Sequence, residues 1–291
     1  MKLLTAVFLL CSMSVFAQDD LMSLLDEGGE NQQVESAFKS TRLISGQTTE
    51  MRKAGVLDFV ISHRFGTVNQ GIEQFYGLDD SQIRLGLDFG ISDRLNIGIG
   101  RSSFQKIVDG MIKFKILNQQ TGEKSAPVSV VAFTSMAIKT GDGAFIDPTL
   151  DHPFSDRLYS TVQLLVSRKM NTNLSLQLMP TYIHRNLVPS GQYPNDVIAV
   201  GVGGRYKVTQ RMAINAEWYP QVTDKGPDIY DALSFGVDIE TGGHVFQIHI
   251  TNSRSMIEQG FVSETTGNWG DGDIHLGFNV SRVFDLSPKK K

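Results

Sequence analysis

Residues 83–100 read IRLGLDFGISDRLNIGIG, and this stretch decides the fold class. Apolar residues occupy every second position on both sides of Ser92-Asp93-Arg94, a compact polar turn. Alternate residues of a β-strand point to opposite faces of the sheet, so a period of two predicts strands with one apolar and one polar face. The stretch therefore predicts two antiparallel strands joined by a tight turn.

The same alternation continues along the chain in both directions. The further segments are 57–65, 112–116, 128–138, 161–167, 174–179, 198–205, 214–219, 233–240, 246–251 and 274–281. They bring the count to roughly twelve strands of about 10 residues, an even number and the length that a tilted membrane strand requires. We predict an all-β protein, a single antiparallel transmembrane β-barrel.

The connections between these strands alternate in length. The short ones, rich in turn residues, are 92–94, 118–125, 169–173, 209–211 and 241–243, and the long ones are 66–80, 140–153, 187–195, 221–231 and 254–271. One link near 104–106 is short on the side of the long loops. Short periplasmic turns and longer extracellular loops are typical of outer-membrane barrels, and a soluble sandwich has no reason to sort its loops in this way.

The N-terminus predicts export. Lys2 precedes an apolar run, and small residues follow before Ala17, which is the order of a cleaved signal peptide, so we expect residues 1–17 to be removed. Residues 18–50 form a polar leader, an arm or a plug; residues 51–286 form the barrel; residues 287–291 form a basic tail. Localisation in the cell outer membrane is expected.

Composition excludes several classes of function. The chain has 27 Lys and Arg against 31 Asp and Glu, a net charge of −4, so nucleic acid is not an expected partner. Cys11 is the only cysteine and lies in the predicted signal, which leaves the mature protein without disulfides or thiol chemistry. No cofactor is expected. The partners that we expect are outer-membrane lipid, the barrel-assembly machinery, and a small polar solute or a partner protein.

Alternation alone does not separate a membrane barrel from a soluble, lipocalin-type barrel. Both have alternating strands, but the polar face lines the interior of the first and the apolar face lines the interior of the second. Glycines favour the membrane barrel, since they recur on the polar face and would make room in a crowded lumen for long charged side chains. Aromatic residues near strand ends would then form interfacial belts. We place Tyr159, Tyr182, Tyr206 and Trp218 in these belts.

The polar face also supplies the candidate functional residues, which have charges of both signs. The lumen-lining candidates are Asp58, Arg64, Arg84, Asp88, Lys113, Lys115, Arg205, Glu217, Asp238, Glu240, His249 and His275. They would line a pore for a polar solute, or they would pair with one another and close the lumen. We favour paired charges, because a buried charge without a partner is costly.

Two chemical sites have weaker support. Asp271, Asp273 and His275 resemble part of a calcium site, but two carboxylates are too few and a turn explains them as well. A surface hydrolase would use His184 with Arg185 and Asn186, or His152 with Asp151. No Gly-x-Ser-x-Gly motif accompanies these residues, so we predict that the protein is not an enzyme.

The working prediction of function is a narrow pore or a solute-uptake barrel, and the alternative is a non-conducting barrel that is structural or docks a partner. The last long loop bears on this choice. Met256, Ile257, Phe261 and Val262 would form a docking patch or a short helix folded over the mouth.

Several stretches carry a resemblance to a known family. They are 63–66, 83–87, 177–181, 203–207, 240–247 and 268–275, continuing to Arg282-Val283-Phe284. With these, nearly the whole mature chain resembles a Bacteroidota family of outer-membrane β-barrels known only as a domain of unknown function. The resemblance implies a barrel and no activity. Residues 285–291 follow Phe284, whereas such barrels usually end on an aromatic residue.

Overall fold

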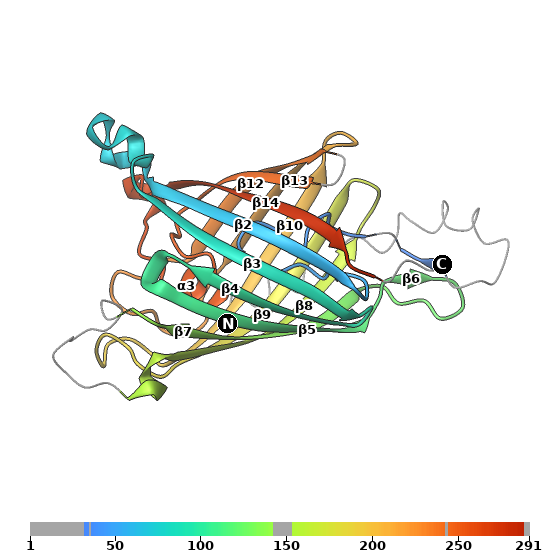
Figure 1. Ribbon diagram of the computed structural model, residues 1–291, viewed down its shortest axis with the longest axis horizontal. Helices are drawn as coiled ribbons and strands as arrows, with labels where there is room; N and C mark the ends of the chain where they lie inside the picture. Colours follow the sequence, from blue (N-terminus) through green and yellow to red (C-terminus); the bar gives the residue numbers. More distant parts are fainter. Residues whose placement is uncertain (1–31, 35, 142–152, 242–243, 288–291) are drawn as a thin grey trace, which may run out of the picture.

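The computed structural model describes residues 32–34, 36–141, 153–241 and 244–287. Twelve of the described strands pair in antiparallel order into one closed barrel (Figure 1). These are β2 (Val56–Thr67), β3 (Ser81–Ser92), β4 (Leu95–Ser102), β5 (Ile107–Leu117), β7 (Ser129–Lys139), β8 (Leu158–Lys169), β9 (Leu174–Arg185), β10 (Asp196–Lys207), β11 (Met212–Tyr219), β12 (Ala232–Thr241), β13 (His244–Thr251) and β14 (His275–Asp285). The predicted fold class is confirmed.

The barrel closes between its first and last strands. β14 pairs with β2, with Val280 opposite Ile61 in the middle of the pair. We call the end of the barrel that carries the short turns, such as that between β3 and β4, the turn end, and the opposite end the loop end. A separate two-stranded sheet of β1 (Gln32–Gln33) and β6 (Gln120–Thr121) lies at the turn end (Figure 1).

Apolar side chains cover the outside of the barrel and polar ones face the lumen. On β3, Leu85 and Leu87 are 44% and 43% exposed, whereas Arg84 and Asp88 are buried. A lipocalin-type barrel has the opposite arrangement, so the faces are those of a membrane barrel. No helix in the described part of the chain is long and apolar enough to cross a membrane.

The predicted aromatic belts are partly wrong. Tyr182, Tyr206 and Trp218 are exposed on the outer face near strand ends. Tyr159 instead faces the lumen and is only 5% exposed. The reason is its position on β8, where its inward side chain packs below the ammonium group of Lys139, 4.3 Å from the ring centroid.

Two segments fill the lumen. We call residues 36–53 the arm; it runs inside the barrel from the turn end to the start of β2 (Figure 1). The second segment is the last loop, residues 252–274, which carries the short helix α3 (Glu258–Ser263), every residue of which is buried. The leader before residue 32, and with it the predicted signal peptide, lies outside the described residues, as do residues 142–152 and 288–291.

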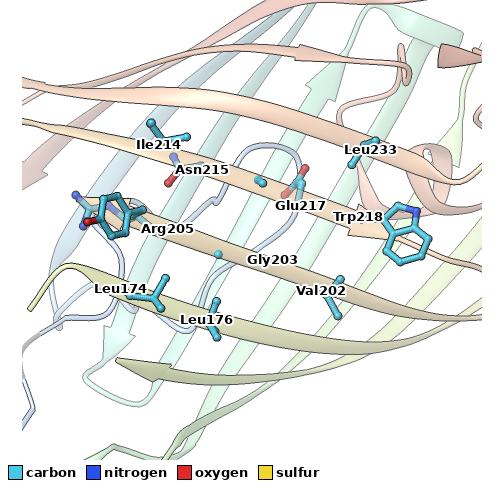
Figure 2. Close-up of a pocket in the computed structure, with 13 residues that line it drawn as sticks. Leu174, Leu176, Val202, Gly203, Arg205, Ile214, Asn215, Glu217, Trp218 and Leu233 are labelled. Carbon is cyan, nitrogen blue, oxygen red and sulfur yellow. The ribbon is translucent and has the colours of Figure 1, made fainter. Parts of the chain in front are cut away.

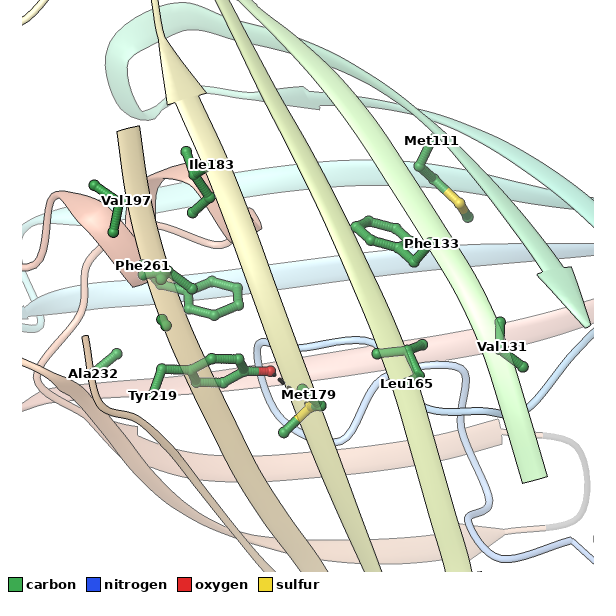
Figure 3. Close-up of a cluster of buried hydrophobic side chains, with 12 residues drawn as sticks. Met111, Val131, Phe133, Leu165, Met179, Ile183, Val197, Tyr219, Ala232 and Phe261 are labelled. Atoms are coloured by element: carbon green, nitrogen blue, oxygen red, sulfur yellow. Dashed lines mark hydrogen bonds between the residues drawn. The ribbon is translucent and has the colours of Figure 1, made fainter. Parts of the chain in front are cut away.

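Part of the inner wall is apolar and packs against α3. Side chains from β5, from β7 to β11 and from Ala232 of β12 join Phe261 and Val262 in one buried cluster (Figure 3). Tyr219 meets Phe261 edge to face, with ring centroids 4.9 Å apart, and its hydroxyl contacts the sulfur of Met179 at 3.0 Å. The apolar side of the lumen therefore holds the helix by packing.

Lumen glycines make room for these contents. A Cβ atom at Gly100 would collide with the guanidinium group of Arg84, and one at Gly203 would collide with Leu43 of the arm. The absence of a side chain on the wall is thus required where a long side chain or the arm lies against it.

Candidate functional site: the filled lumen

The arm enters the lumen as a tight reversal of the chain. Residues 40–49 are buried without interruption, and so are Ala37 and Phe38, whereas Lys39 between them is exposed. At the tip, Leu43 N donates to Gly46 O at 2.9 Å, and Thr48 N donates to Thr41 O at 2.9 Å. These two bonds leave the amides of the turn itself directed at the barrel wall, where they need an acceptor.

Glu217 on β11 supplies that acceptor. Its carboxylate accepts from the backbone amides of Ile44 at 3.3 Å, Ser45 at 2.7 Å and Gly46 at 3.1 Å. Successive amides that converge on one anion form a strong, charge-assisted anchor. Glu217 is 2% exposed, so solvent does not compete for these bonds.

Amide and hydroxyl side chains hold the rest of the arm. Gln247 donates to Leu43 O at 2.8 Å, and Asn279 donates to Ile44 O at 2.8 Å. On the other side of the lumen, Gln177 accepts from Thr49 N at 3.0 Å. The arm is therefore bound to the wall mainly through hydrogen bonds on three sides of the barrel.

Several charged wall residues form ion pairs. Arg84 makes a two-pronged ion pair with Asp109, and Arg52 at the end of the arm bonds to Asp58. Arg205 lies between Asp238 at 3.7 Å and Glu240 at 3.3 Å. Pairing of this kind offsets the desolvation of charges that the lumen buries.

Arg64 has a different environment. Its guanidinium group contacts the ring of His249 and donates to Ser45 Oγ at 2.9 Å. It thus joins the wall, through Ser45, to the tip of the arm that Glu217 holds from the other side.

The last loop contacts the arm from the loop end. Arg42 of the arm lies 3.8 Å from the carboxylate of Glu258 on α3, and both side chains are 3% exposed. Burial raises the pKa of the Glu258 carboxyl above its usual range. The loop is tied to the wall as well, since Gln259 donates to Ser135 at 2.9 Å and Glu264 pairs with Lys139 at 3.0 Å.

The structure places the twelve lumen candidates on the inner face of the wall. Ten are buried, while Lys115 and Glu240 at the turn end are half-buried. The structure brings some of them together, as Arg205, Asp238 and Glu240 show. His275 lies apart from these and bonds to the carbonyl of Phe65 at 2.7 Å.

Several charged residues of the lumen are missing from the predicted set, among them Asp109, Lys139, Arg185, Arg42 and Glu258. Asp109 lies two residues before the inward Met111 on β5 and therefore on the same face, so the alternation could have predicted it. Arg42 and Glu258 lie in the arm and the last loop, where no periodicity indicates which side chains enter the barrel.

The carboxylates of the candidate calcium site have ordinary partners. Asp273 accepts from Asn69 Nδ2 of the loop after β2 at 2.7 Å and from Asn268 N at 3.1 Å, and Asp271 accepts from Asn268 Nδ2 at 2.7 Å, so both carboxylates have hydrogen-bond partners. Within the described ranges, no three His, Cys, Asp or Glu side chains gather as a metal site would need. Asp151 and His152 lie outside the described residues.

Cavities remain at the turn end on both sides of the arm. One of about 410 Å³ lies beside Thr49, Arg52 and Lys115, and another of about 390 Å³ lies beside Lys39, Arg205 and Lys207. Ser36 and Ala37 border both. The arm therefore divides the space through which a solute would have to pass.

A third cavity, of about 440 Å³, lies on the outer wall between β9, β10 and β11 (Figure 2). Leu174, Leu176, Ile214 and Trp218 surround it, while Glu217 contacts the arm on the lumen side. Its lining suits lipid chains rather than a polar solute.

Comparison with solved structures finds other barrels. The NanC porin is 10% identical with a TM-score of 0.48, covering 80% of this chain and 100% of its own. An outer membrane channel from Pseudomonas putida F1 is 14% identical with a TM-score of 0.46, covering 81% and 97%. Outer membrane phospholipase A from Escherichia coli is 11% identical with a TM-score of 0.44, covering 79% and 91%. Likenesses at this level transfer no activity to this chain.

Sequence comparison is more decisive about the family. No curated protein sequence matches the chain significantly. A family model described as a membrane bound beta barrel domain (DUF5777) matches residues 38–284, which include the arm from Phe38 onward and all twelve barrel strands except the last residue of β14. The chain belongs to this family of membrane-bound β-barrels.

Proposed function

We propose that the protein is an outer-membrane channel for a polar solute, and that the arm is a plug that closes it at rest. The turn end would face the periplasm, because the predicted export signal would deliver the N-terminal leader there. The observation that carries the proposal is the way in which the arm is bound. A mostly polar segment that is held mainly by hydrogen bonds to a polar wall can leave and be replaced by water, because both surfaces have hydration to gain.

The wall that the arm covers supports a hydrated pathway. Glu217, Gln177, Gln247 and Asn279 all bond to the arm, and each would face water if the arm left. A barrel with no pathway to open could fill its interior with wall side chains, as small barrels do. Here a separate segment fills it instead.

The rival proposal is a non-conducting barrel, and α3 favours it. Phe261 and Val262 pack into the apolar cluster on the inner wall, and burial of this kind is not readily reversed by hydration. If α3 stays in place when the arm leaves, the lumen remains closed at the loop end. One experiment on the arm separates the two proposals.

The experiment locks the arm to the wall with a disulfide. Thr49 Oγ1 and Ser167 Oγ lie 2.5 Å apart, so the double variant T49C/S167C brings two sulfur atoms near bonding distance. Cys11 is the only native cysteine and lies in the predicted signal. We expect voltage-driven openings in planar bilayers under reducing conditions and none after oxidation, with S167C alone insensitive to oxidant.

A variant without residues 37–49 completes the test. For a plugged channel we expect it to conduct constitutively, provided that it still migrates as a folded barrel on unboiled SDS gels. If neither this folded variant nor the reduced double-cysteine protein conducts, the channel proposal is overturned and the non-conducting barrel is favoured.

A further inference from the structure

A row of polar side chains crosses the outer wall at the loop end, on a surface that is otherwise apolar. Asp196 on β10 pairs in register with His184 on β9, and His184 pairs with Ser160 on β8. All three face outward, because their neighbours along each strand are buried: Val197, Ile183 and Arg185, and Tyr159 and Thr161. Three adjacent strands thus present an acid, an imidazole and a hydroxyl in order.

The acid and the imidazole are joined. His184 Nδ1 lies 2.7 Å from Asp196 Oδ1, and the hydroxyl of Tyr182 donates to the same oxygen at 2.6 Å. An ionised carboxylate can only accept, so the proton of a neutral imidazole must be on Nδ1. Nε2 then carries the free lone pair, which is the tautomer that a general base for a hydroxyl needs.

Ser160 lies on the side of His184 opposite to Asp196. Cross-strand partners have Cβ atoms about 5 Å apart, so the Ser160 hydroxyl is within a side-chain rotation of the imidazole. The structure has the Asp–His bond and no Ser–His bond. Bonds between a nucleophile and its base are often long before substrate binds, so this geometry is compatible with a catalytic group.

The position of the row indicates its substrate. Ser160 is the third residue of β8, and Asp196 is the first residue of β10, so the row lies at the rim of the barrel. Along the same strands, the next residues on the outer face toward mid-strand are Val162 and Ile198, which are 56% and 47% exposed. A lipid whose chains lie along that apolar wall would have its ester groups near the rim.

We propose that Ser160, His184 and Asp196 form a catalytic site that hydrolyses carboxylic esters of membrane lipids. Ser160 and His184 are its catalytic residues, and Asp196 is a positioning residue. The site is on the outer wall, so it does not depend on whether the lumen conducts.

The reaction balances with water as the only co-reactant. His184 Nε2 takes the hydroxyl proton as Ser160 Oγ bonds to the ester carbonyl carbon, and the proton passes to the departing alcohol oxygen as that C–O bond breaks. Water, deprotonated by the same nitrogen, then attacks the acyl-serine. The fatty acid leaves and Ser160 regains its proton.

The test uses the full-length protein in detergent, folded by the criterion of faster migration before boiling. A fluorophosphonate probe should label Ser160, and a phospholipid with a fluorescent acyl chain in mixed micelles should be hydrolysed. We expect S160A to abolish both, and H184Q to reduce both to background. S81A is the matched control, because Ser81 is an exposed serine at the loop end of β3 that pairs with Phe65 and not with a histidine.

D196N tests the positioning role. It should lower kcat by about 10³–10⁴-fold with KM unchanged, because an amide favours the wrong tautomer of His184. A folded wild-type protein that is neither labelled nor active on the phospholipid overturns the proposal, and the row is then an interfacial anchor. Labelling that persists in S160A overturns it as well.

Discussion

Glu217 shows how one wall residue determines where the arm lies. Its carboxylate gathers three consecutive backbone amides at the tip of the arm, and no other described side chain bonds to those amides. Backbone amides are obligatory donors, so their burial is tolerated only because this acceptor is present. The three amides, together with the nearby Arg64, in turn offset the cost of burying the Glu217 carboxylate away from water.

We therefore predict that E217A releases the tip of the arm. Loss of this acceptor should weaken arm binding by on the order of 2–4 kcal/mol, because buried donors are left unpaired. Hydrogen exchange of the peptide spanning 38–49 should accelerate. E73A, a change of an exposed glutamate in the loop after β2, should leave that exchange unchanged. Unaltered protection in E217A would show that the carboxylate is not the anchor.

At the scale of elements, the arm and α3 are joined through one buried pair, Arg42 and Glu258. Because burial raises the pKa of Glu258, the folded state binds its proton more tightly than the unfolded state does. The free energy of unfolding therefore falls as pH rises from the pKa of Glu258 in the unfolded state through its higher pKa in the folded state. Above that pKa the contribution of Glu258 is constant.

The variant E258Q should remove this contribution. At low pH the wild-type side chain is neutral and the two proteins should melt alike; as pH rises above about 4.5, the melting temperature of E258Q should gain on that of the wild type. Melting followed on SDS gels or by circular dichroism between pH 4 and pH 8 measures the difference. A difference that stays constant, or that shrinks as pH rises, would contradict the assigned shift.

Elements differ in how far sequence could predict them. The strands were predictable because a half-buried strand imposes a period of two, as Leu85 and Leu87 against Arg84 show. Tyr159 lies two residues before the inward Thr161, so the alternation indicates its inward face and the expectation from its aromatic type alone was wrong. The path of the arm and the entry of α3 were beyond prediction, since their bonds join residues up to 235 positions apart. The same holds for the row of Ser160, His184 and Asp196, which depends on the pairing of three strands.

The whole molecule has an inside-out distribution of polarity, and this predicts how it tolerates charge. Leu87 lies near the middle of β3 and is 43% exposed on the outer wall. In a bilayer, L87K should cost about 2–4 kcal/mol, because it places a charge in the hydrocarbon layer. L286K is the control, since Leu286 is 59% exposed just beyond the last strand.

Unfolding by urea in lipid vesicles, read as loss of the fast-migrating band, measures both variants. Equal stability of L87K and L286K would mean that water, and not lipid, surrounds the barrel wall. A larger loss for L87K would extend the membrane assignment of the family to this particular surface.

The pairing of β14 with β2 also constrains biogenesis. The two strands that meet there begin at Val56 and end at Asp285, so the barrel cannot close until β14 has been delivered. The arm is made before either of them and is joined directly to β2. The arm must therefore either lie within the open sheet before the barrel closes or enter through the turn end after closure. The order of the chain makes the entry of the arm a distinct step of assembly.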